Sequence, residues 1–181
     1  VGGAIIAFRS GVWKPGVFPA GQQPAWRDAQ EWARIHTPTD AVFITPPQRM
    51  GFFTPDWRVF SQRSTVVTLA ELLEAAYAPE YLAHWEPRFE ALAPGALAQF
   101  RGDFFRNLRT TSEAFYSLST PQVLQIAHRY GATYLVVEQP HWRDLPEAYR
   151  NEGFVVYRLP LESSLLNPST NRSASSRVLY P

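Results

Sequence analysis

The sequence contains no cysteine and is poor in charged side chains for its length. Without cysteine it can form no disulfide, no thiol nucleophile and no cysteine-based metal site, and its four histidines show no ligand spacing. Its 17 basic and 16 acidic side chains leave a formal net charge of +1, which gives no broad positive field to hold a phosphate backbone. We therefore expect no metal, no cofactor and no nucleic acid partner.

The composition is nevertheless that of a folded protein. Hydrophobic residues make up 45% of the chain and aromatic residues 14%, which excludes intrinsic disorder, and 181 residues suffice for one domain with a core. The charged fraction of 18% lies below the roughly 25% that is usual for soluble domains. We expect part of the surface to face something other than water.

Pattern and composition divide the chain into three parts. Residues 1–23 are predicted to be a membrane-proximal segment and linker, residues 24–160 an α/β domain, and residues 161–181, rich in Ser, Asn, Thr and Pro, a flexible tail. The expected fold is a small three-layer domain with a predominantly parallel sheet of about four strands and a helical insert at 69–118.

The individual elements follow from periodicity and from turn residues. Apolar residues recur at three-and-four spacing over 24–36, which predicts an amphipathic helix, and a second helix is predicted from Thr120-Pro121 to Gly131. The predicted strands are 41–45, 133–138 and 154–159, with one or two further short strands in 57–61 and 64–68. A short helix is expected over 144–151, so the last two strands should pair in parallel through a right-handed crossover.

The first residues form an apolar run, Val1–Phe8, that is closed by Arg9. A membrane-spanning helix needs about 20 such residues, so this run is interpreted as the last turns of a transmembrane helix that includes Ile5, Ile6 and Phe8. Trp13 then suits the interfacial belt. An edge strand and linker of a soluble domain fits the same pattern.

A candidate pocket follows from the expected sheet, because ligands in open parallel sheets bind beyond the carboxyl ends of the strands. The two loops that leave such ends carry Thr45 and Arg49, and Glu138 and His141, and the nearby Arg63 could add donors for a phosphate or carboxylate. The alternative is structural, with Arg49 and Arg63 in ion pairs or bonded to carbonyls and His141 as a surface or capping residue. No catalytic acid, base and nucleophile set is visible.

The helical insert is rich in aromatic residues and is the predicted docking surface. Interface cores are depleted in charge and enriched in aromatic residues and Arg. The candidate docking residues are Trp85, Phe89, Phe104, Phe105 and Arg106. The alternative places these aromatic side chains in the core.

Several runs of the sequence carry a family resemblance. Residues 32–47, which contain Thr-Pro-Thr-Asp-Ala, together with 51–52, 60–63 and 127–138, resemble the extramembrane C-terminal domain of bacterial polytopic membrane proteins. Most of these proteins are uncharacterised, and they are distantly similar to the GT-C glycosyltransferases, which use lipid-linked sugars. In that group the catalytic carboxylate lies in an early loop between membrane helices, so the resemblance transfers no catalytic residue. Phe53 also stands where the group often has a basic residue.

The resemblance implies a noncatalytic domain on the extracytoplasmic, periplasmic side of a bacterial membrane. It would bind or dock beside a membrane or a membrane-embedded protein, with a lipid or lipid-linked sugar as a further partner. Two related alternatives are an accessory domain of a GT-C-like glycosyltransferase and a structural subunit of a large respiratory or photosynthetic membrane complex. A free-standing soluble enzyme is the remaining alternative.

Overall fold

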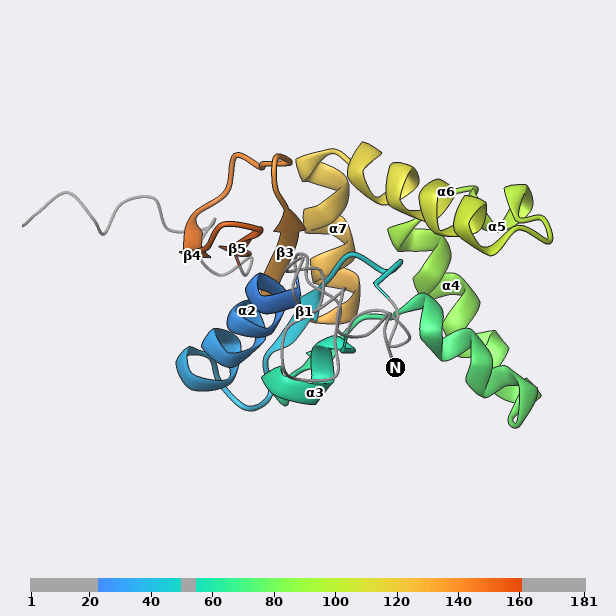
Figure 1. The fold of residues 1–181 in the computed structure, drawn as a ribbon, viewed down its shortest axis with the longest axis horizontal. Coiled ribbons are helices and arrows are strands. Elements are labelled where there is room, and N and C mark those ends of the chain that lie inside the picture. Colours follow the sequence, from blue (N-terminus) through green and yellow to red (C-terminus); the bar gives the residue numbers. More distant parts are fainter. Residues whose placement is uncertain (1–22, 50–54, 161–181) are drawn as a thin grey trace, which may run out of the picture.

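The fold is built around a mixed five-stranded sheet with strand order β2-β1-β3-β5-β4. The structure, a computed structural model, describes residues 23–49 and 55–160 (Figure 1). The strands are β1 (Val42–Ile44), β2 (Ser64–Thr65), β3 (Tyr134–Glu138), β4 (Glu147–Arg150) and β5 (Phe154–Arg158). The helices, with η for 3-10 helices, are α2 (Gln23–His36), α3 (Trp57–Ser61), η1 (Leu69–Ala76), η2 (Pro79–Tyr81), α4 (Leu82–Leu92), α5 (Ala96–Gln99), α6 (Phe104–Ser117) and α7 (Thr120–Tyr130).

The sheet confirms the predicted α/β class and the neighbourhood of the three central strands. β1 runs parallel to β2 and to β3, whereas β5 is antiparallel to both β3 and β4. The sheet therefore has five strands rather than about four. The predicted parallel pairing of the last strand is wrong.

The error has its origin in residues 144–151, where a helix was expected and the edge strand β4 is found. Asn151 begins a tight turn, because its Oδ1 accepts hydrogen bonds from the N–H groups of Gly153 (3.0 Å) and Phe154 (2.8 Å). This turn joins β4 to β5 as a hairpin, and strands joined by a tight turn must pair antiparallel.

The predicted strand at 57–61 is also wrong, because these residues form the short helix α3. The Asp56 carboxylate caps the helix by accepting the N–H of Arg58 at 2.9 Å. Trp57 is buried, with its ring 5.1 Å from that of Trp26 and 4.9 Å from that of Phe43, centroid to centroid. Aromatic packing and a cap thus outweigh the strand preference of this segment.

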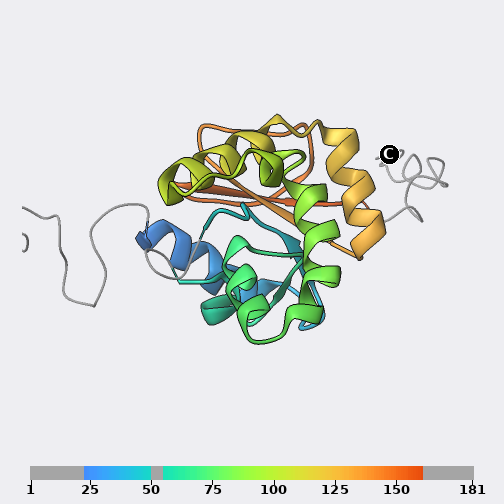
Figure 2. The same cartoon turned by 90° about the vertical axis from the view of Figure 1, so that its right-hand side faces the viewer.

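Helices cover both faces of the sheet and make three layers, as predicted. Side chains alternate along the strands, so Phe43, Val136 and Val156 join α2 and α3 in one core, while Leu135 and Val155 join α4, α6 and α7 in another. Figures 1 and 2 show α2 and α7 on opposite sides of the strands. The stretch 69–118 contains helices and no strand.

A buried carboxylate joins the helical stretch to the rest of the domain. Glu71 in η1 accepts hydrogen bonds from the Thr68 N–H (3.0 Å) and the Tyr81 hydroxyl (2.6 Å), and it pairs with Arg58 of α3. Burial, and then the bond to Glu71, raise the pKa of Tyr81 to about 12. The neutral hydroxyl is therefore kept as a donor to the carboxylate.

Candidate functional site

The carboxyl ends of β1 and β3 lie side by side at one edge of the sheet. The two strands are parallel, with Ile44 opposite Leu135. After β1 the chain forms β2 on one side of β1 and then crosses over to form β3 on the other side. The direction in which successive strands are added to the sheet therefore reverses between β1 and β3. Ligand sites of open α/β sheets lie beside such a reversal point. This edge is therefore the place to test the predicted site.

An ion pair joins the two loops at this edge. An Arg49 Nη atom lies 2.6 Å from Glu138 Oε1, and the two side chains are only 12% and 22% exposed. The Arg49 guanidinium also lies 4.7 Å from the ring centroid of Phe154 and 5.2 Å from that of Trp26. The structure thus brings Arg49 and Glu138 together, but in the structural role that was the alternative interpretation.

Tyr116 of α6 completes the cluster, and sequence reasoning missed it. Its hydroxyl oxygen accepts the N–H of Glu138 at 3.2 Å, and the His141 ring stacks on its ring with centroids 3.7 Å apart. Burial, and then the nearby Glu138 charge, raise the pKa of Tyr116, which keeps the phenol neutral. Nothing in the spacing of Tyr116 distinguishes it from a core residue of α6.

Both loops are also bonded to the carboxyl-terminal half of α6. Gln48 Nε2 donates to Ser112 Oγ at 3.1 Å, and Arg143 Nη2 donates to the Tyr116 carbonyl at 3.2 Å. These two hydrogen bonds fix α6 to the loops that follow β1 and β3. In chemical terms the arrangement holds elements together, and Glu138 is committed to Arg49 rather than poised as a base.

The other two predicted ligand residues are used within the protein, and only Thr45, directly after β1, lies at this edge. Thr45 is buried and its hydroxyl bonds to the Thr65 hydroxyl at 3.0 Å. Arg63 precedes β2, and because β2 is parallel to β1, this places Arg63 at the amino edge of the sheet. The prediction that Arg63 adds donors to the same pocket is wrong.

Arg63 is instead a buried structural residue with all five N–H donors used. Nε donates to Thr37 Oγ1 (3.1 Å), one Nη to the carbonyls of Ser61 (3.4 Å) and Gln62 (3.1 Å), and the other to those of Arg34 and Thr37 (2.7 Å each). Two of these carbonyls belong to the carboxyl end of α2, where the helix dipole favours a cation. No donor remains for a ligand.

The predicted docking residues separate into two groups. Trp85 and Phe89 are 2% and 0% exposed and stack on each other in the core, so their assignment to a docking surface is wrong. Phe104 and Phe105, at the start of α6, are 38% and 65% exposed, and Arg106 is exposed beside them. Both phenylalanines also make contacts within the chain.

The remaining predicted positions cannot be compared with the structure. Ile5, Ile6, Phe8 and Trp13, and the tail 161–181, lie outside the described residues. Within the described part, no helix has the length and apolarity needed to cross a bilayer. Across 23–49 and 55–160 there is also no group of three or more His, Asp or Glu side chains arranged to hold a metal ion.

Comparison with known proteins gives one partial match. A family described as a domain of unknown function, DUF6798, matches residues 24–92. No curated protein and no solved structure matches the chain. The matched segment runs from α2 to the end of α4, so it includes Arg49 and Arg63 but neither Glu138 nor α6. Over these residues the chain is similar to a family of unknown function.

Proposed function

We propose that this chain is a noncatalytic docking domain that lies on a membrane surface containing anionic lipids, through the amino-terminal half of α6. One observation carries the proposal: two exposed phenylalanines stand among arginines at the start of this helix. The extracytoplasmic face of a bacterial membrane, which the family resemblance implies, is the proposed location.

The charges around the two phenylalanines favour an anionic surface. Arg101, Arg106 and Arg109 are all exposed. The one acidic side chain among them, Asp103, is the helix cap and accepts the Arg106 N–H at 3.1 Å. Each arginine near an anionic membrane contributes about 1 kcal/mol, so three contribute about 3 kcal/mol.

The phenylalanines add an apolar contribution to this attraction. Complete burial of a phenylalanine side chain contributes about 1.5–3 kcal/mol, and Phe105 still exposes 65% of its surface. Insertion of the ring at the level of the headgroups would therefore add about 1–2 kcal/mol. The sum corresponds to reversible contact rather than permanent anchoring.

The fixed carboxyl-terminal half of α6 gives such a contact a defined orientation. Gln48 and Arg143 bond this half to the loops after β1 and β3. Docking through the other half would then hold the carboxyl edge of the sheet in a fixed position relative to the membrane.

Vesicle co-sedimentation of the full chain tests the proposal. Phosphatidylcholine vesicles containing phosphatidylglycerol should bind the chain, and pure phosphatidylcholine should bind it less. Phe105→Ser with Arg106→Gln should lower the partition coefficient about tenfold or more. Tyr77→Ser, which changes an exposed aromatic residue outside α6, is the matched control and should bind normally.

Two results would contradict the proposal. Unchanged vesicle binding of the double variant would remove α6 from the contact and assign attachment to another part of the chain. Binding to native bacterial membranes without binding to either vesicle would point to a membrane-embedded protein as the partner in place of lipid.

A further inference from the structure

A hollow of about 640 Å³ opens at the amino edge of the sheet, opposite the cluster of Arg49 and Glu138. Its wall is largely apolar and includes Pro38, Tyr134, Pro146 and Leu159. A volume of this size lies within the range of about 300–1,000 Å³ that is usual for sites of small ligands. The hollow is therefore large enough for a small molecule.

Two side chains of opposite charge line the same hollow. Asp40 lies in the turn after α2, and Arg158 is the last residue of β5. Both are exposed, and within the described part of the chain neither side chain forms a hydrogen bond or an ion pair. An apolar hollow with one carboxylate and one guanidinium matches a ligand that has an ammonium group, a carboxylate and apolar side chains between them.

The sheet register fixes how far apart the two charges stand. Phe43, Tyr134 and Arg158 lie opposite one another on β1, β3 and β5, so Phe43 and Arg158 are two strand spacings, about 10 Å, apart. Asp40 precedes Phe43 by three residues and lies in the turn that the Ala41 N–H closes on the Pro38 carbonyl at 3.1 Å, so its distance from Phe43 is less than the about 10 Å of a fully extended stretch. The Cα atoms of Asp40 and Arg158 are therefore on the order of 10–14 Å apart.

We propose that this hollow binds short apolar peptides with free termini. The Arg158 guanidinium receives the peptide carboxylate, Asp40 receives the ammonium group, and the peptide side chains lie against Tyr134 and Leu159. An extended peptide spans about 3.3–3.6 Å per residue, so two or three residues cover about 7–11 Å. The arginine and aspartate side chains span the remainder of the separation.

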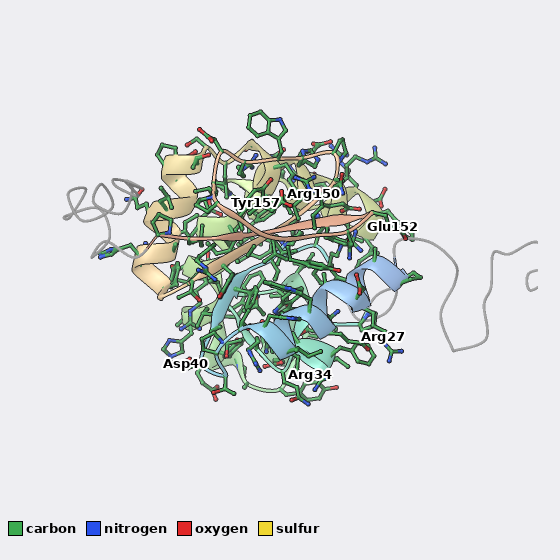
Figure 3. The ribbon with its side chains drawn as sticks, turned by 90° about the vertical axis from the view of Figure 1, so that its left-hand side faces the viewer. Arg27, Arg34, Asp40, Arg150, Glu152 and Tyr157 are labelled. Atoms are coloured by element: carbon green, nitrogen blue, oxygen red, sulfur yellow. The ribbon has the colours of Figure 1, made fainter. Side chains whose placement is uncertain are left out.

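Titration of the full chain with the dipeptide Leu-Leu, followed by calorimetry, tests this site. We expect saturable binding that weakens about tenfold or more in Asp40→Asn and in Arg158→Gln, since each loses a charge-assisted contact. Glu152→Gln and Arg27→Gln are matched controls at exposed positions. Figure 3 shows Asp40 on one side of the domain and Glu152 and Arg27 on the other. Both test positions are exposed, so thermal melting should show folded variants.

Blocked dipeptides assign each charge to its partner. N-acetyl-Leu-Leu lacks the ammonium group and should bind the parent chain and Asp40→Asn equally. Leu-Leu-amide lacks the carboxylate and should bind the parent chain and Arg158→Gln equally. Absence of saturable binding by Leu-Leu, or binding that neither substitution weakens, overturns the proposal, whatever the vesicle experiment shows.

Discussion

Replacing Arg63 with methionine is expected to lower the free energy of unfolding by about 3–5 kcal/mol. Arg63 is only 6% exposed, and its bonds go to one hydroxyl and four carbonyls rather than to a carboxylate. The methionine side chain keeps the apolar contacts of the stem but donates no hydrogen bond. The substitution therefore removes the charge and the five donors but keeps most of the apolar contacts.

The magnitude follows from the groups left behind. The carbonyls of Thr37 and Ser61 are buried and those of Arg34 and Gln62 are partly exposed; each loses a donor, and a buried acceptor without a partner costs about 1–3 kcal/mol. Four fully buried acceptors would sum to about 4–12 kcal/mol, and the two partly exposed ones recover part of this by bonding to water. The desolvation cost of the buried guanidinium disappears with Arg63 and offsets part of this loss, which gives about 3–5 kcal/mol. Such a loss is a large part of the usual stability of a domain.

Urea unfolding followed by tryptophan fluorescence measures this loss. Arg63→Lys keeps the charge but has three donors in place of five, so it should fall between the parent chain and Arg63→Met. Arg109→Met, on the exposed side of α6, is the control and should change stability by less than about 0.5 kcal/mol. A loss below about 1 kcal/mol in Arg63→Met, with the control unchanged, would refute the reasoning.

Four further outcomes test the packing and the ionic contacts. Val136→Asp buries a charge at a fully buried position of β3 and should abolish cooperative unfolding by circular dichroism; an unchanged melting temperature would remove β3 from the core. Glu71→Gln should lower the free energy of unfolding by about 2–3 kcal/mol in urea, because it weakens three hydrogen bonds and an ion pair. In the folded state the pKa of Tyr81 is raised from 10.0 to about 12, so its contribution to stability is fully present below pH 10 and is lost as the pH rises toward 12; Tyr81→Phe should flatten this alkaline loss in melting curves. Arg49→Met and Glu138→Gln should each destabilise the domain by about 3 kcal/mol, while the double variant should lose less than the sum in urea unfolding.

The sequence predicts the parts of the fold whose local signals agree with their packing. The periodicity of 24–36 predicts α2 almost to the residue, and Gly131 ends α7 with a φ of 67°, as its place after the helix suggests. The cap of α7 is Ser119 rather than Thr120, since the Ser119 hydroxyl accepts the Gln122 N–H. Helix ends that are predicted from residue preferences are commonly displaced by one residue.

The errors occur where a long-range contact decides between two local preferences. Residues 57–61 are rich in strand-forming types, but Trp57 fills the space between Trp26 and Phe43, and a helix places it there. Asp56, a residue type that is common at helix N-caps, was the feature of the sequence that indicated a helix at this point. Residues 144–151 have helix-forming composition, but pairing with β5 makes them a strand, and the Asn-Glu-Gly turn at 151–153 was the signal of a hairpin.

The candidate site could be predicted in position but not in role. The rule that ligands gather at the carboxyl ends of parallel strands brought Arg49, Glu138 and His141 together, and the structure places all three there. The sequence could not indicate that Arg49 and Glu138 satisfy each other, or that Tyr116 lies between the loops. Those contacts depend on how α6 packs, which no periodic pattern in residues 104–117 specifies.

Aromatic content alone is a weak guide to docking in this protein, because much of it is buried. Trp26, Trp57 and Trp85 are among the largest fully buried side chains, so the low charged fraction needs no partner to explain it. What distinguishes the start of α6 is the combination of exposed phenylalanines with exposed arginines. Trp142 is a single exposed aromatic residue whose neighbour Arg143 is half-buried and bonded to the carbonyls of Trp142 and Tyr116, and single exposed apolar residues are ordinary on protein surfaces. The exposed fraction, together with the charge of the neighbours, therefore decides where a docking experiment should begin.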